Sequence, residues 1–318
     1  MNHLLLTLCN NLWAIEPNFA LSLMSELEKM LPYAKFEQLP EPIESINIVA
    51  KDANIVPYQV DDFGNVSFNK AEKNSVALIS LRGVMTKHNQ FCGPAGCETI
   101  ANRILTADNH NNIAATILAV ESGGGAVSAI NPIIDAFNAC KKPTAVWIDD
   151  IAASAALMIS PFADFVMARH KMSRIGSLGV MGMYQNDDKK LESEGIKLYS
   201  YYSKYSISKN KTEIEAMQGN GEMILNKVID PICRNMLSLY AEKRDAKLRD
   251  NLETFMANVD AGRLDNISPN NVFTGEMFFA YECLPITGNG LIDNIGSIGQ
   301  CAEQLLQLSN SQIKISTK

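Results

Sequence analysis

The chain has 318 residues, of which 47% are hydrophobic and 20% charged, and its formal net charge is −7 at pH 7. A chain of this length can bury a sizeable core in one large domain or two small ones. The acidic balance argues against a nucleic-acid-binding protein, which usually carries a basic surface. No apolar run reaches the roughly 18 residues of a membrane span. We therefore expect neither nucleic acid nor a membrane as a partner.

Residues 1–73 differ in pattern from the rest and are expected to form an N-terminal appendage and linker. Within them, residues 19–30 have the apolar spacing of a helix, and a stretch containing proline and glutamate follows at 39–42. Residues 1–9 are leucine-rich but lack the basic residues of a signal peptide. The expectation is a cytoplasmic protein that is neither secreted nor anchored.

From residue 74 onward, short apolar runs alternate with helical patterns up to residue 308, before a C-terminal tail at 309–318. The expected strands are 76–81, 113–120, 144–148 and 165–168, and the expected helices are 126–140, 152–162, 219–244 with a kink at Pro231, and 297–308. This alternation predicts an α/β domain with a largely parallel sheet and flanking helices.

The seven cysteines include no CxxC pair. Cys92 and Cys97 are the nearest pair in the sequence, and no histidine lies close to them. We expect reduced thiols of a cytosolic protein, with a disulfide between Cys92 and Cys97 as the alternative. We expect no metal site and no organic cofactor.

Three short segments carry residues suited to chemistry. Ser122-Gly123-Gly124-Gly125 follows a predicted buried strand, where glycines either make a tight turn or let backbone amides approach an oxyanion or phosphate. Ser154 lies among alanines at a strand-to-helix junction, a place for a nucleophilic serine or for an ordinary helix N-cap. Residues 175–182 alternate glycine with apolar residues and predict a tightly packed strand beside this site.

In this order and spacing, the three segments resemble the signal peptide peptidase A (protease IV) family, whose phage branch includes head-maturation, protein C-like peptidases. The matching residues are Arg82-Gly83-Val84, Ser122-Gly123-Gly124-Gly125, Ala152-Ala153-Ser154-Ala155-Ala156, Gly176-Ser177-Leu178-Gly179-Val180 and Gly290-Leu291-Ile292-Asp293-Asn294-Ile295-Gly296. Gly123 replaces a usual proline and Leu157 a usual tyrosine, and neither change removes a catalytic atom. The resemblance covers residues 75 to 305 and implies a Clp/crotonase-like fold.

The resemblance also implies roles for individual residues. Ser154 would be the nucleophile of a Ser-Lys dyad, in which a lysine amine kept neutral by desolvation takes the serine proton. The oxyanion would lie between the backbone N–H groups of Gly125 and Ala155, with Gly124 beside them.

The base is expected just after a strand over 196–202, where three lysines are candidates. Lys209 is preferred because its serine neighbours could orient an amine, while Lys204 and Lys211 remain open. A Ser-His-Asp arrangement would instead need one of the four histidines, of which His170 is the candidate.

As a whole, the resemblance implies a serine endopeptidase that acts on protein or peptide substrates. The expected setting is a phage or prophage, with a capsid or scaffold protein as substrate in the host cytoplasm or procapsid, and a homo-oligomeric enzyme. The alternatives are a housekeeping peptidase that degrades signal peptides, a crotonase-type acyl-thioester enzyme in which Ser154 is idle, and an inactive assembly scaffold.

Overall fold

The computed structural model of this chain describes residues 66–90 and 94–316, preceded by four short strands of which only the backbone is described. Those strands are β1 (Trp13–Ile15), β2 (Ile48–Lys51), β3 (Asn54–Pro57) and β4 (Gln59–Val60). The helix expected over 19–30 lies outside the described residues, as does Cys92. Cys97, the other member of the possible disulfide, is a free, buried thiol.

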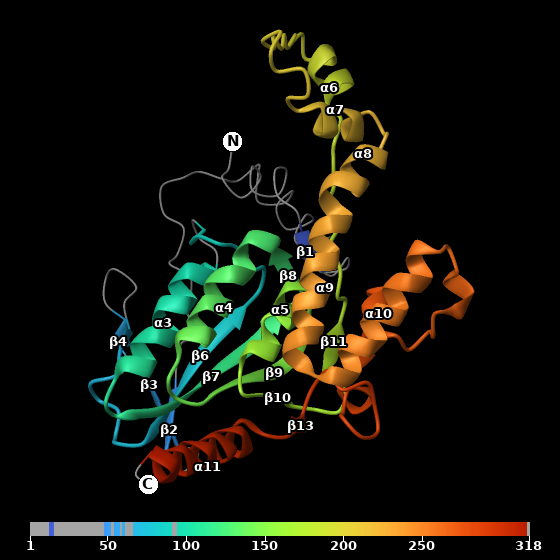
Figure 1. The fold of residues 1–318 in the computed structure, drawn as a ribbon. Helices are drawn as coiled ribbons and strands as arrows, with labels where there is room; N and C mark the ends of the chain where they lie inside the picture. Colours follow the sequence, from blue (N-terminus) through green and yellow to red (C-terminus); the bar gives the residue numbers. More distant parts are fainter. Residues whose placement is uncertain are drawn as a thin grey trace.

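The centre of the molecule is a nine-stranded sheet with the order β12-β11-β9-β7-β6-β2-β3 (Figure 1). In addition, β10 pairs with β9, and β13 pairs with β10. Its strands after residue 74 are β6 (Ser75–Arg82), β7 (Ile113–Ser122), β9 (Thr144–Ala153), β10 (Phe165–Ala168), β11 (Arg174–Gly176), β12 (Met277–Phe279) and β13 (Asn294–Ile295). The pairs β6–β7, β7–β9, β9–β10 and β9–β11 are parallel, whereas β2–β6 and β11–β12 are antiparallel. The expected α/β fold with a largely parallel sheet and flanking helices is confirmed.

Helices cover both faces of this sheet. The longer ones are α3 (Cys97–Asn109), α4 (Ile130–Ala139), α9 (Asp230–Arg244), α10 (Ala246–Asp260) and α11 (Ile298–Ser316). Helices α3 and α4 lie together over one face, and α11 contacts β6, β7 and β9 (Figure 1). No helix in the described part of the chain is long and apolar enough to cross a membrane.

The apolar strands are buried on both faces because each face has its own hydrophobic core. In β6, Ala77 and Ile79 belong to the main core with α3 and α4. The alternate residues Val76 and Leu78 pack in a smaller core that includes Leu305 of α11. Side chains of a strand point alternately to opposite faces, so a near-continuous apolar run is what a doubly covered strand requires.

The N-terminal segment contributes to this sheet. Strand β2 pairs with β6, and β3 pairs with β2. The division into 1–73, 74–308 and 309–318 stays a prediction, but the sheet crosses the first of these boundaries. Helix α11 continues to Ser316, past the expected helix end at residue 308.

The long helical pattern over 219–244 forms three consecutive pieces. They are α8 (Glu222–Ile224), a π-helical turn (Leu225–Ile229) and α9, with Pro231 in the first turn of α9. A proline has no N–H to donate and clashes with the preceding turn of a regular helix. The π-helical turn therefore lies where the expected kink was placed.

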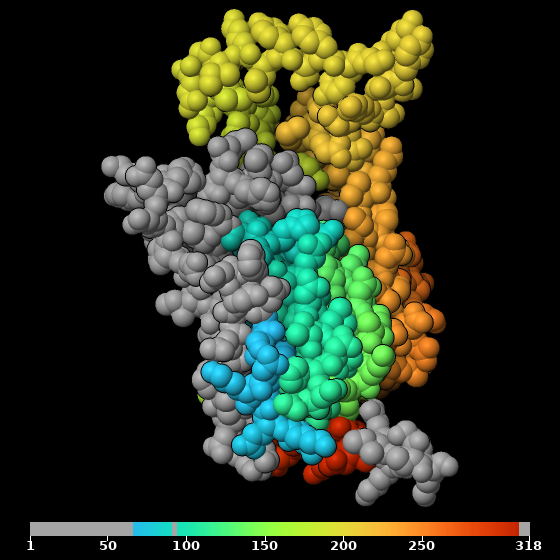
Figure 2. Space-filling model, turned by 90° about the vertical axis from the view of Figure 1, so that its left-hand side faces the viewer, coloured from blue at the N-terminus to red at the C-terminus, as the bar shows by residue number. Residues whose placement is uncertain are grey.

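Residues 183–221, which we call the arm, extend away from the sheet beyond the end of α9 (Figures 1 and 2). The arm contains α6 (Asp188–Ser193) and α7 (Lys211–Met217), and the strand expected over 196–202 is wrong because this segment has no regular structure. Its apolar side chains, which suggested a strand, are mostly exposed, with Leu198 at 74% and Tyr201 at 90%.

The closing Gly-Leu-Ile-Asp motif is held by an ion pair between Asp293 and Arg244 of α9. Two guanidinium nitrogens of Arg244 donate to the carboxylate at 2.6 and 3.0 Å, and its Nε donates to the Gly290 carbonyl at 2.9 Å. Asp293 also accepts from the Val166 backbone N–H at 2.7 Å. Asp293 therefore joins the closing motif to β10 and to α9, which is a structural role.

We expect Arg244→Met to lower the free energy of unfolding by about 2–3 kcal/mol, because it leaves the half-buried Asp293 carboxylate without its charged partner. The matched control is Arg234→Met, which breaks the exposed ion pair with Asp260 and should cost less than about 1 kcal/mol. Urea unfolding of both variants measures the difference. Equal losses would show that the Arg244 pair is not a specific tether.

Candidate active site

Ser154 lies at the junction between strand β9 and the short helix α5 (Ala155–Met158). The last strand residues, Ala152 and Ala153, are fully buried, and so is the helix that follows. Small side chains are needed here because the chain reverses direction inside the core. The sequence therefore builds a sharp strand-to-helix turn with one hydroxyl at its tip.

The backbone of Ser154 is strained in the way that such a turn demands. Its φ is 55° and its ψ is −119°, a region that residues with a β-carbon rarely adopt. This conformation is typical of nucleophilic serines at strand-to-helix turns, where it presents the hydroxyl and leaves the next N–H groups facing the same space. An ordinary N-cap has extended backbone and a side-chain bond into its helix, and Ser154 has neither.

The surroundings of Ser154 come from the Gly-Ser-Leu-Gly-Val motif. The Ser154 N–H donates to the Gly176 carbonyl at 2.9 Å, and its Oγ donates to the Gly179 carbonyl at 3.4 Å. A β-carbon on Gly176 would meet the Glu276 carbonyl oxygen at 2.2 Å, so only glycine fits. The expected strand over 175–182 ends at Gly176, and the rest of the motif passes over the serine as an irregular segment.

The Ser-Gly-Gly-Gly segment is fixed by a second set of bonds. Ser122 Oγ donates to the Gly83 carbonyl at 2.6 Å and accepts from the Gly124 N–H at 3.1 Å. A β-carbon on Gly125 would lie 2.1 Å from the Met85 carbonyl oxygen, so the backbone passes there without space for a side chain. Residues 124–126 form the short strand β8, which contacts α5. The early Arg-Gly-Val motif, the glycine segment and the serine turn therefore interlock.

The candidate oxyanion donors lie on these two elements. Gly124 and Gly125 belong to β8, and Ala155 begins α5 directly after the serine. The first N–H groups of a helix have no partner within the helix. The structure thus brings together the segments that carry Ser154, Ala155 and the two glycines.

The candidate lysines are not on these elements. Lys204, Lys209 and Lys211 are exposed on the arm, whose helix α7 lies far from α5 (Figure 1). Lys204 lies over the Tyr205 ring at 5.0 Å, and Lys211 forms an ion pair with Glu215 at 3.8 Å. Among the described residues of a single chain, none of the three lysines forms a hydrogen bond with Ser154.

The histidine and cysteine candidates do not form a catalytic arrangement with Ser154 in the described part of the chain. His170 is an exposed turn residue whose backbone N–H donates to Ser173 Oγ at 3.3 Å, and no bond to Ser154 is recorded in the described part. Burial raises the pKa of the Cys97 and Cys301 thiols to about 12, which disfavours the reactive thiolate. Among the described residues, no cluster of His, Cys, Asp and Glu is placed to hold a metal ion.

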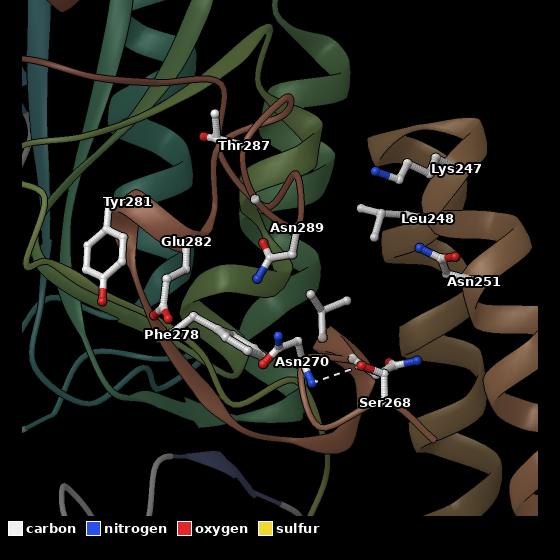
Figure 3. A pocket seen from close by; sticks show the side chains of 13 residues that line it. Lys247, Leu248, Asn251, Ser268, Asn270, Phe278, Tyr281, Glu282, Thr287 and Asn289 are labelled. Carbon is white, nitrogen blue, oxygen red and sulfur yellow. Dashed lines mark hydrogen bonds between the residues drawn. The ribbon is translucent and has the colours of Figure 1, made fainter. Parts of the chain in front are cut away.

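A separate pocket of about 540 Å³ lies between α10 and the segment around β12 (Figure 3). Lys247, Leu248 and Asn251 line it from α10, and Glu282 and Asn289 line it from the opposite wall. None of the candidate catalytic residues lines this pocket, so it offers no site for the serine chemistry.

We expect Ser154→Gly to be more stable than Ser154→Ala by about 1 kcal/mol, because glycine adopts a positive φ without strain. Alanine keeps the β-carbon and with it the strain at φ 55°. Both variants lack the hydroxyl, so the comparison isolates the backbone. Thermal unfolding of the two proteins gives the difference, and equal stability would mean that the turn stores no strain.

Two curated proteins are similar to this chain over most of its length. Protease 4 of Haemophilus influenzae is 23% identical over 243 residues, which cover 75% of this chain and 35% of that protein. Protease 4 of Salmonella typhi is 24% identical over 247 residues, again covering 35% of its length. The chain thus spans about a third of the length of these curated relatives.

A solved structure and a family model are also similar to this chain. A crystal structure of an enoyl-CoA hydratase/isomerase family member can be superposed on this chain with a TM-score of 0.36 and 12% sequence identity. The superposition covers 85% of this chain and 76% of the other. The model of peptidase family S49 matches residues 136–312, which include Ser154 and Asp293 and make up more than half of the chain. The chain therefore belongs to peptidase family S49.

Proposed function

We propose that this chain is a serine endopeptidase in which Ser154 is the nucleophile and a lysine of the arm is the general base. The observation that carries this proposal is the strained turn at Ser154, with φ 55° and ψ −119°, set between β8 and the Gly176–Gly179 segment. Strain persists only where surrounding structure fixes it, and it is found mainly at functional sites.

In this mechanism, Ser154 Oγ attacks the carbonyl carbon of the scissile peptide while the lysine Nζ accepts the hydroxyl proton. The oxyanion is stabilised by the N–H groups of Ala155 and Gly125, because the Gly124 N–H already donates to Ser122 Oγ, and each such donor is worth about 2.7–4 kcal/mol of barrier. The lysine then gives its proton to the leaving amine. Water hydrolyses the resulting ester, with the lysine again accepting a proton.

The lysine is proposed to come from a second copy of the chain. The arm, whose sequence includes Lys209, extends away from the sheet and from α5, the helix that follows Ser154 (Figure 1). The arm also exposes a set of large apolar side chains: Leu198, Tyr199, Tyr201, Tyr205 and Ile207, each at least 72% exposed. Large apolar side chains left exposed together in one segment are candidates for an interaction site, and soluble oligomers are mostly symmetric assemblies of one chain. A homo-oligomer would bury this surface and complete the dyad.

The natural substrate is proposed to be a capsid or scaffold protein, in the head-maturation role of the phage branch, within the host cytoplasm or the procapsid. This part of the proposal rests on the resemblance of the five motifs. It predicts that genes for portal and major capsid proteins flank the gene for this chain.

Proteolysis of an unfolded protein such as casein tests the proposed activity. The full chain should release peptides, and pretreatment with a fluorophosphonate should stop their release, because this reagent phosphonylates the serine nucleophile irreversibly, with fluoride as the leaving group. Cleavage that continues at the same rate after complete fluorophosphonate treatment would contradict a serine mechanism.

A further inference from the structure

One edge of strand β8 (Gly124–Ala126) forms backbone hydrogen bonds with Met85. The Met85 N–H donates to the Gly124 carbonyl, and the Ala126 N–H donates to the Met85 carbonyl, both at 2.9 Å. Successive residues of a strand direct their backbone groups to opposite edges. The N–H and C=O of Gly125 therefore point to the other edge of β8.

That second edge is occupied by β1 (Trp13–Ile15), a strand from the start of the same chain (Figure 1). The pairing is antiparallel, with Ala14 opposite Gly125 and Ile15 opposite Gly124. Because Gly125 directs both of its backbone groups to this edge, Ala14 and Gly125 form a hydrogen-bonded pair. The N–H of Gly125, one of the candidate oxyanion donors, is therefore engaged by β1.

The same edge is where an extended peptide substrate would bind. β8 contacts α5, which begins directly after Ser154, and it carries the candidate oxyanion glycines. Peptides commonly bind by adding a strand to an open sheet edge, because main-chain hydrogen bonds supply affinity for any sequence. A peptide antiparallel to β8 directs its carboxyl end toward Gly124, as β1 does with Ile15. β1 thus has the direction expected for a bound peptide, with the Ala14 carbonyl at the Gly125 N–H, where the carbonyl of a scissile bond would lie.

We propose that residues 13–15 act as a built-in pseudosubstrate strand, which blocks the peptide-binding edge of β8 until a substrate displaces it. This inference rests on the proposed peptidase function. It adds a regulatory role to the N-terminal segment: the chain is held in a self-inhibited state, and activation requires release of β1 from β8.

The pairing is tested with Ala14→Pro, which removes the N–H that faces Gly125. The matched control is Ala14→Val, which keeps that N–H and favours extended backbone. Hydrogen exchange at single-residue resolution should show the Gly125 amide exchanging about tenfold faster in Ala14→Pro than in the wild type, because losing the Ala14 N–H bond makes the pair open more often. The Ala126 amide, which is bonded to Met85, should be unchanged and serves as the internal control.

The inhibition is tested by the rate at which a fluorophosphonate labels Ser154 in the same proteins. Ala14→Pro should be labelled about tenfold faster than the wild type and Ala14→Val. A synthetic peptide that covers residues 11–18 should slow the labelling of Ala14→Pro back toward the wild-type rate.

Three results would overturn the proposal, and each has a different meaning. An unchanged Gly125 exchange rate would show that β1 does not cover this edge. Faster exchange with an unchanged labelling rate would show that β1 covers the edge without inhibiting. If the wild-type protein is found to begin at Ile15 while the Ser154→Ala protein keeps its full N-terminal segment, β1 is cleaved as a substrate and is not an inhibitor. If no variant is labelled while exchange still responds, the serine peptidase itself fails and the pairing stands.

Discussion

Ser154→Ala should lower kcat/KM for casein-derived peptides by a factor of roughly 10⁴ to 10⁶, the range seen when other serine peptidases lose their nucleophile. The hydroxyl is the atom that forms the covalent bond, and no neighbouring side chain on the turn can replace it. The protein should remain folded, because a methyl group occupies the same buried space as the 2% exposed serine side chain.

The matched control for this variant is Ser160→Ala. Ser160 is also fully buried and follows α5, but its Oγ donates to the Leu157 carbonyl at 2.7 Å and has no role in the proposed chemistry. It should keep most of the activity. If Ser154→Ala cleaves at the wild-type rate, the nucleophile assignment is wrong.

Lys209→Ala should lose activity about as completely as Ser154→Ala, because the members of a catalytic unit do not contribute additively. Lys204→Ala and Lys211→Ala should each keep most of it. The wild-type kcat/KM should climb with rising pH, since an amine must be unprotonated to accept the serine proton. If Lys204 or Lys211 is essential instead, the dyad stands with another lysine. If all three are dispensable and His170 is required, the Ser-Lys mechanism fails.

Co-expression of Ser154→Ala with Lys209→Ala tests whether the lysine comes from another copy. In a randomly mixed assembly, about a quarter of the sites combine an intact serine with an intact lysine, so about a quarter of the wild-type activity should return. A lysine acting within its own chain would leave every site incomplete and the mixture inactive.

The sequence was most informative where burial imposed a pattern. The runs at 76–81 and 113–120 are apolar on both strand faces, and they form β6 and β7 because α11 and the α3–α4 pair cover opposite sides of the sheet. The alanines around Ser154 likewise indicated a strand-to-helix junction with small neighbours, and the structure has a buried strand-to-helix turn there.

The expected strand over 196–202 failed for a physical reason. Its isoleucine, leucine and tyrosines have the composition of a strand, but the chain provides no partner strand or core for them, and they stay exposed on the arm. Composition alone does not distinguish residues that pack within one chain from residues that face a second copy.

The pairing of β1 with β8 could not be predicted from the sequence either. Residues 13–15 are too few for a periodic pattern, and their partner lies more than a hundred residues along the chain. The glycines of β8 carry no side-chain pattern that would mark a strand. The ion pair between Asp293 and Arg244 was also not predicted, because nothing in the sequence distinguishes Arg244 from the other charged residues of its helix.

The central claim, that Ser154 is the nucleophile, is tested most directly by locating the adduct of a fluorophosphonate on the full chain. Digestion and mass spectrometry should find a single modified site, on the peptide that contains Ser154, and the adduct should vanish in Ser154→Ala and after denaturation before labelling. An adduct on another residue, or none on a protein that cleaves casein, would contradict the account.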